Sequence, residues 1–385
     1  MADFYSKIKS IFTDTPLLSM RTVYIIWILG FIFRFIASLT HQEYIDYAEF
    51  RLPIAKALAG GDLLYRDYPY NHMPIYPYIS GFMYTISPKE PVILSMFIRL
   101  PMTIADSLVP FAIYLLLKSM NQERIGQWAS MIYAINPISI YEIALSHWDG
   151  MAVLFALLGL TAIIKNKMEV AGVFAAIGFM VKQFPLAIIL VGILHTKNLK
   201  RSLRMIISSV FVILLILGPF LIICPTDFIN GIFSHKVYLG TEGEGIIVGS
   251  VASIFQYLPE PWGRVLWGIL FGLALLIPML KVRQENILQF TGLLFVLLSI
   301  FVYVTHRQMI VWCLPFLFIL LVQKWDRAWI PVLLLGIGYW IRLIKPPFYF
   351  GIIVLIAGIW LYYLFYQDLN EIYNRESKRS EQYKK

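Results

Sequence analysis

The stretch that decides the architecture is residues 41–88, HQEYIDYAEFRLPIAKALAGGDLLYRDYPYNHMPIYPYISGFMYTISP. It separates an apolar segment at residues 20–40 from a second one that starts near residue 92. It carries the acids Glu43, Asp46, Glu49, Asp62 and Asp67, together with His72. Only 14% of the chain is charged, so a loop this rich in acids is a candidate functional site.

The composition places the flanking segments in a membrane. The chain has 385 residues, 59% of them hydrophobic, and a mean hydropathy of +0.71. Apolar runs of about 17 to 25 residues recur along it, each long enough to cross a bilayer core. Buried core helices of this kind would need a soluble shell, and the sequence offers none. We therefore expect an all-α polytopic membrane protein.

The apolar runs predict about twelve transmembrane spans. Two of them, 169–181 and 184–195, are short enough to form one broken hairpin. The expected spans are residues 20–40, 92–117, 126–145, 149–164, 169–181, 184–195, 205–224, 263–281, 286–304, 309–323, 328–343 and 347–365. Three regions follow: a module at 1–195, a second transmembrane module at 196–366 and a cytoplasmic tail at 367–385.

Basic residues set the expected orientation. Lys7, Lys9 and Arg21 precede the first span, and pairs such as Lys165 and Lys167 recur in alternate loops. Because Lys and Arg collect in cytoplasmic loops, both termini are expected inside. Loops 41–90 and 225–262 then lie outside. The net charge of +9 is explained in the same way, without nucleic acid as a partner.

Three smaller expectations follow from local sequence. Residues 44–58 carry an apolar stripe that includes Ile45, Phe50 and Ile54, so we predict a short amphipathic helix that Gly60 and Gly61 end. Residues 1–19 do not resemble a cleavable signal, so the first span is expected to target the chain. The two cysteines, Cys224 and Cys313, form no metal or disulfide pattern.

Ionisable side chains recur at the expected outer ends of the spans. Such groups at membrane depth usually face a cavity or a partner. Structural roles remain open for several: Arg34 and Arg99 as snorkelling side chains, and Asp106 as the partner of Arg99, seven residues away on one helical face. The set is Arg34, Arg99, Asp106, Glu142, His147, Asp149, Lys182, His235, Lys236, His306, Arg307, Arg342 and Lys345.

The order of these features resembles the C-type glycosyltransferase superfold, whose members take sugars from polyprenyl or dolichyl phosphates. The resemblance covers residues 20 to about 195 and points to the mannosyltransferase-like branch. It is carried by FRF at 33–35, YIDYAEF at 44–50, GDLLYRDYPYNHMPIYPY at 61–78, RLP at 99–101, NP at 136–137, SHWDG at 146–150 and VKQFP at 181–185.

The resemblance implies a glycosyltransferase with Asp46 as general base on the non-cytoplasmic face. Glu49 and Asp149 would be supporting acids. The donor phosphate would be held by Lys182, in a matching context, with His306, Arg307 and Arg34 as further candidates. Sugar or acceptor binding would fall to His72, Tyr70, Trp148 and His235.

The expected partners are a polyprenyl-phosphate hexose donor, a lipid-linked or glycolipid acceptor and membrane lipids. The strict D-x-D form is absent, which leaves a requirement for Mg²⁺ or Mn²⁺ open. The membrane would be a prokaryotic plasma membrane or the endoplasmic reticulum.

Two other functions remain open at this point. About twelve spans with inner termini also suit a secondary transporter for a sugar or organic anion. Transporters commonly show two similar halves, and no repeat matches residues 20–195 to 200–365. A non-catalytic subunit of a lipid-glycan assembly complex is a third hypothesis, and the acidic loop argues only weakly against it.

Overall fold

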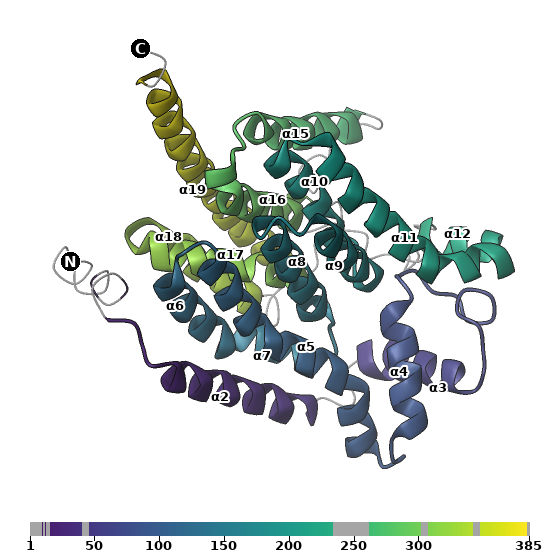
Figure 1. Ribbon diagram of the computed structural model, residues 1–385. Coiled ribbons are helices and arrows are strands. Elements are labelled where there is room, and N and C mark those ends of the chain that lie inside the picture. The colour runs from purple at the N-terminus through teal and green to yellow at the C-terminus, as the bar shows by residue number, and fades with distance from the viewer. Residues whose placement is uncertain are drawn as a thin grey trace. The chain divides into compact units, whose positions relative to one another are not determined.

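The structure is a computed structural model of the whole chain, shown in Figure 1. It describes residues 16–40, 46–233, 262–301, 307–341 and 347–382, together with Ser10 and Phe12. Within these ranges the regular structure is helical, apart from one isolated β-bridge between Leu64 and Tyr68. The expectation of an all-α fold is therefore confirmed for the part of the chain that the structure describes.

Membrane-compatible helices occur in both halves of the chain. Four are long and apolar enough to cross a bilayer, at Met20–Ser38, Pro91–Ser119, Leu199–Ile223 and Ile353–Glu376. Shorter apolar helices of 10–17 residues occupy other expected spans, among them Asp149–Ile164 and Ile310–Gln323. Helices thus stand where hydropathy predicts them, while the count of twelve crossings and their orientation stay predictions.

The chain divides into two compact units, each described here by itself. The second unit, residues 18–189 and 200–245, holds the candidate site. Its elements are α2 (Met20–Ser38), η1 (Asp46–Arg51), α3 (Leu52–Ala59), α4 (Ile75–Ile86), α5 (Pro91–Ser119), α6 (Glu123–Ala134), α7 (Pro137–Ala144), α8 (Asp149–Ile164), α9 (Met168–Val181), η2 (Phe184–Leu186), α11 (Leu199–Ile223) and α12 (Pro225–Phe233).

The first unit comprises residues 1–17, 190–199 and 246–385. Close helix packing marks it, because a Cβ added at Gly292 would lie 2.5 Å from Phe365 and one at Gly358 would lie 2.4 Å from Ile300. Its elements are most of α10 (Ala187–Thr196), then α15 (Trp262–Met279), η3 (Gln284–Asn286), α16 (Ile287–Phe301), η4 (Arg307–Met309), α17 (Ile310–Gln323), α18 (Trp325–Ile341) and α19 (Pro347–Gln382).

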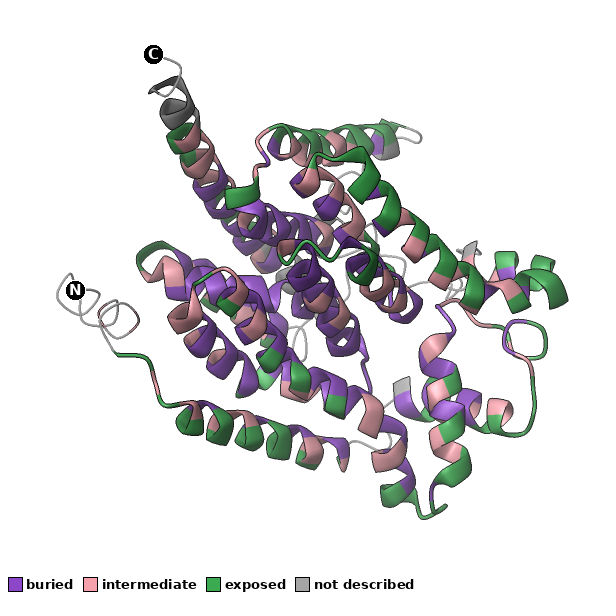
Figure 2. Cartoon of the chain, viewed as in Figure 1, coloured by how far each residue is buried: buried purple, intermediate pink, exposed green. Residues whose placement is uncertain are grey.

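Helix α5 is the central element of the second unit, packing against α2, α6 and α8. Its inward face is apolar along most of its length, with Ile98, Met102, Val109 and Ile113 fully buried. Figure 2 shows that the helices of this unit differ in burial. Helices α2 and α11 are largely exposed, whereas α8 is largely buried. Exposed apolar faces on long helices are what lipid contact requires.

One expected span is interrupted. The sequence predicts a single segment at 126–145, whereas the structure has α6 ending at Ala134 and α7 beginning at Pro137. Asn136 caps α7, because its side-chain oxygen accepts hydrogen bonds from the backbone N–H groups of Ile138 (3.0 Å) and Ser139 (3.1 Å). An Asn cap followed by proline at the first helical position starts a new helix, which explains the break.

Candidate functional site

The described part of the acidic loop starts with helical turns from Asp46 to Ala59, where a short helix is expected. The π-helical turn η1 leads into α3, and Pro53 stands at the start of α3. Proline has no N–H for the i−4 bond, which favours a wider turn before it. Gly60 caps α3 and Gly61 has φ +98°, a conformation that glycine adopts readily, so the two glycines end the helix as expected.

The turn after α3 is held by one carboxylate. Asp67 accepts a hydrogen bond from the backbone N–H of Leu63 at 2.8 Å and two from Arg66 at 2.8 and 2.9 Å. The Arg66 guanidinium, together with the Leu63 N–H, lowers the pKa of Asp67 to about 2. Both groups are exposed, so this pair shapes the turn more than it stabilises the fold.

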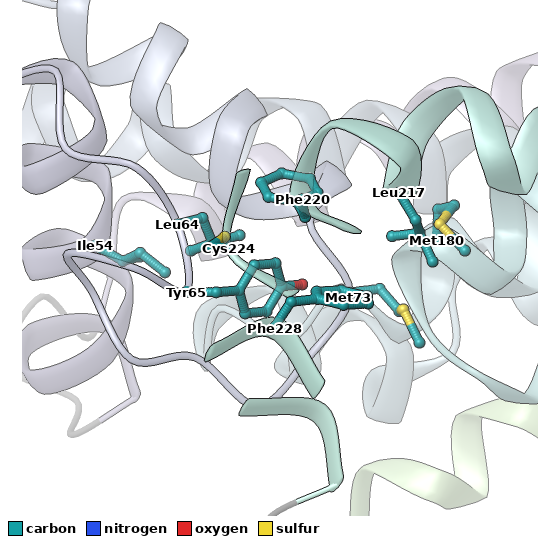
Figure 3. Packing of buried hydrophobic residues seen from close by; sticks show 9 residues of the cluster. All are labelled: Ile54, Leu64, Tyr65, Met73, Met180, Leu217, Phe220, Cys224 and Phe228. Carbon is teal, nitrogen blue, oxygen red and sulfur yellow. The ribbon is translucent and has the colours of Figure 1, made fainter. Parts of the chain in front are cut away.

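Tyr65 anchors the loop to a distant helical corner. Its φ is +73°, which is unusual for a bulky residue, yet its side chain is buried. Figure 3 shows its ring beside Phe220 at the end of α11 and Phe228 in α12. The ring centroids lie 5.2 and 4.9 Å apart in edge-to-face geometry, which is favourable for aromatic pairs.

The same core extends further along the loop and the corner. Ile54 of α3, Met73 of the loop and Met180 of α9 join it. Gly231 of α12 is also part of the contact, because a Cβ there would lie 2.6 Å from the carbonyl oxygen of Tyr70. The loop between α3 and α4 is therefore packed against α11 and α12.

This packing positions His72. The hydroxyl of Tyr65 donates a 2.7 Å hydrogen bond to the backbone carbonyl of His72. The His72 ring lies 5.6 Å from the ring of Tyr70 and 5.7 Å from that of Trp148, both edge-to-face. The structure thus brings together three of the residues that the sequence predicts for sugar or acceptor binding.

Trp148 is the centre of the group, which we call the Trp148 cluster: Arg51, Tyr70, His72, Tyr76 and Trp148. The guanidinium carbon of Arg51 lies 3.5 Å from the centre of the indole ring, and the Tyr76 ring lies 4.3 Å away. Burial raises the pKa of Tyr76 above its ordinary value of 10, so its phenol is protonated at neutral pH. The cluster joins η1, the loop before α4, α4 itself and the start of α8.

The next residue, Asp149, forms a buried ion pair with Lys182. Nζ of Lys182 lies 2.7 Å from Oδ1 and 2.9 Å from Oδ2 of Asp149, and both side chains are buried. Asp149 begins α8 and Lys182 follows α9, so the pair closes the hairpin that these helices form. Two predicted site residues are thus in direct contact, one as the other's counter-charge.

The side chain of Arg34 is fully hydrogen-bonded inside the protein. Its Nε donates to the carboxylate of Asp106, and its four remaining N–H groups face four acceptors. These are the carbonyl oxygens of Gly30, Ala134 and Tyr133 and the hydroxyl of Ser139, at 2.5–3.2 Å. Five donors is the full inventory of a guanidinium. The arrangement favours a structural role, joining α2, α5, α6 and α7, over phosphate binding.

The expected pairing of Arg99 with Asp106 is wrong. Asp106 takes Arg34 instead, and also accepts a 2.8 Å hydrogen bond from the Tyr133 hydroxyl. Arg99 points to the other end of the helix, where it donates to Ser146 at 2.6 Å and to the carbonyl of Thr40 at 2.7 Å. Seven residues along one helical face span about 10 Å, which allows two separate partners.

One functional candidate, Arg51, escaped prediction from sequence. Arg51 lies 97 positions before Trp148, and no local pattern links them. Glu142 and His147 form a buried pair through a carboxylate oxygen and Nδ1 of the ring. Both residues are among the ionisable candidates identified from sequence, and the structure shows that they pair across the end of α7.

The remaining predicted residues are placed as follows. Asp46 is the first residue of η1, with its side chain outside the described part, and Glu49 is exposed on the same turn. His235 and His306 lie outside the described residues. Arg307 begins η4 in the other unit, and its side chain is likewise outside the description.

Among the described side chains, no three of the types His, Cys, Asp and Glu gather in a way that could hold a metal ion. Comparison with protein-family models gives no match for this chain. Comparison with curated proteins gives no significant match either.

Proposed function

We propose that this protein is an integral membrane glycosyltransferase that moves a hexose, mannose by the resemblance, from a polyprenyl-phosphate sugar to a lipid-linked or glycolipid acceptor. One observation supports this most. Tyr70 and His72 lie together with Trp148, which is 76 positions further along the chain than His72. Trp148 directly precedes Asp149, the partner of Lys182. The same cluster contains Arg51, the last residue of the turn that Asp46 begins.

The chemistry is a direct displacement. The acceptor hydroxyl oxygen attacks the anomeric carbon of the donor sugar while the bond from that carbon to the phosphate oxygen breaks. Asp46 takes the hydroxyl proton, a role worth about 10²- to 10⁴-fold for a well-placed general base. Polyprenyl phosphate leaves with the bonding electron pair, and the configuration of the sugar inverts.

The other groups have roles that follow from their chemistry. Cationic side chains stabilise the charge that develops on the leaving phosphate. The Trp148 and Tyr70 rings offer apolar faces to a sugar ring, and the imidazole of His72 offers a hydrogen bond to a hydroxyl. The described residues supply no metal-binding set, so no step is assigned to Mg²⁺ or Mn²⁺.

The test is transfer by the purified full chain in lipid nanodiscs. Labelled polyprenyl-phosphate mannose and candidate glycolipid acceptors should yield labelled product in the wild type. Asp46→Asn should abolish transfer while helical circular dichroism is retained. Asp62→Asn, an exposed acid of the same loop, serves as the matched control and should turn over normally.

Two results would overturn the proposal. One is normal turnover by Asp46→Asn, which removes the assigned base. The other is a wild type that consumes no donor but carries labelled sugar or organic anions into liposomes, which would identify a transporter.

A further inference from the structure

Arg51 is a buried cation for which the described side chains supply no acidic partner. Its side chain is 8% exposed, and it makes neither a hydrogen bond nor an ion pair with the described residues. Instead it makes cation–π interactions: the guanidinium stacks on the Trp148 ring and lies 5.9 Å from the centre of the Tyr76 ring. Stacking offsets part of the charge, but it leaves the in-plane Nε–H group without a hydrogen-bond acceptor.

A second unsatisfied donor stands beside the first. The indole Nε1 of Trp148 is buried without a hydrogen-bond partner, as is Nε of Arg51. A buried donor left unpaired costs about 1–3 kcal/mol, and more when the group is charged. A bound ligand with hydrogen-bond acceptors would satisfy both donors, which lie on stacked side chains.

The neighbouring cations are already neutralised. Lys182 is paired with Asp149, and Arg34 with Asp106. Arg51 therefore carries the positive charge that calls for an anionic ligand. Its planar fork suits the two oxygens of a phosphate, with the indole N–H donating to a third.

We propose that Arg51 and Trp148 form a phosphate-binding site, and that in the reaction proposed above it receives the phosphate of the lipid carrier. This assignment rests on the proposed function for the identity of the lipid, while the donors themselves are independent of it. It moves phosphate recognition from Arg34, whose donors are used internally, to a residue five positions after Asp46.

The experiment measures binding of farnesyl phosphate to the purified chain in nanodiscs by calorimetry. Farnesol tests the tail without the phosphate, and inorganic phosphate tests the phosphate without the tail. Arg51→Gln should weaken farnesyl phosphate binding about ten- to hundredfold, the range expected for a lost charged hydrogen bond. Trp148→Phe keeps an aromatic ring, removes the N–H and should weaken binding about two- to tenfold.

Arg66→Gln is the matched control, because Arg66 is an exposed arginine of the same loop paired with Asp67, and it should bind as the wild type does. Stronger binding of farnesyl phosphate than of either fragment supports a lipid-borne phosphate. Equal, Arg51-dependent binding of inorganic phosphate also supports the site but assigns it to a soluble phosphate.

Wild-type affinity in both Arg51→Gln and Trp148→Phe would overturn the site. If Arg51→Gln fails to fold, Trp148→Phe decides. Sugar transfer with an unchanged donor KM in folded Arg51→Gln would refute this inference and leave the enzyme intact. Arg51-dependent phosphate binding without any sugar transfer would support the phosphate site and refute the proposed transferase activity.

Discussion

The carboxylate of Asp106 lies directly against the backbone of Gly150. A Cβ added at Gly150 would stand 2.0 Å from Oδ1 of Asp106. That oxygen also accepts the hydroxyl of Tyr133, and the other oxygen is bound to Arg34. Asp106 is thus fixed by partners from two other helices, and the start of α8 comes close to α5 because residue 150 has no side chain.

Gly150→Ala should therefore destabilise the protein by about 1–3 kcal/mol, the usual effect of overpacking a rigid site. Gly218→Ala on α11 is the control, since nothing lies within 4 Å of its added Cβ and alanine favours a helix. Thermal unfolding in detergent should show a lower Tm for the first variant and an unchanged or higher one for the second. Equal melting temperatures would show that Asp106 moves freely.

The Arg34 side chain is expected to act on stability. Arg34→Gln leaves Asp106 buried without its cation, and breaking a buried ion pair from one side costs about 3–5 kcal/mol. The donor KM of the folded fraction should remain that of the wild type. A large rise in KM with no loss of Tm would instead support direct phosphate binding by Arg34.

The Asp149–Lys182 pair can be examined by a double-mutant cycle. Lys182→Met removes the cation from a buried carboxylate and should cost about 3–5 kcal/mol. Adding Asp149→Asn removes the stranded charge, so the double variant should recover part of that loss. Additive effects of the two changes in thermal unfolding would contradict the contact.

Tyr65→Phe isolates one hydrogen bond. It keeps the ring beside Phe220 and Phe228 and removes the donor to the His72 carbonyl, an expected loss of about 0.5–1.5 kcal/mol. Hydrogen exchange should rise at residues 70–74 first. Protection identical to the wild type there would mean that aromatic packing alone holds the loop.

The turn at Leu63–Asp67 should depend on acid. The folded pKa of Asp67, about 2, lies below its ordinary value, so the carboxylate stabilises the turn above about pH 4. That contribution is lost as the pH falls towards 2. Protection of the Leu63 amide against hydrogen exchange, relative to its intrinsic rate at each pH, should fall over this window in the wild type. In Asp67→Asn the same protection should be low at every pH. Asp62→Asn should follow the wild type.

Much of the helical framework was predictable from sequence, because the signals were local. The expected span 149–164 coincides with α8, and 169–181 with α9 to within one residue. Charged ends and glycines bound these runs. The one broken span followed from Asn136 and Pro137, whose capping signal outweighed continuous hydropathy.

The site was only partly predictable, because its contacts join distant segments. Tyr70, His72 and Trp148 were identified from a loop and a hairpin, and they do lie together. The environment of Arg51 was not predictable, since it depends on contact with the distant Trp148. Likewise, periodicity placed Arg99 and Asp106 on one face but could not reveal that Arg34 reaches Asp106 from α2.

The contact of Tyr65 with the stacked rings of Phe220 and Phe228 limits how this protein can be re-engineered. A chimera that takes residues 60–74 from another sequence would replace Tyr65 with a side chain that does not match the rings of Phe220 and Phe228. Exchange of that segment should succeed only when residues 217–233 travel with it. Evolutionary drift at either place would need a compensating change at the other.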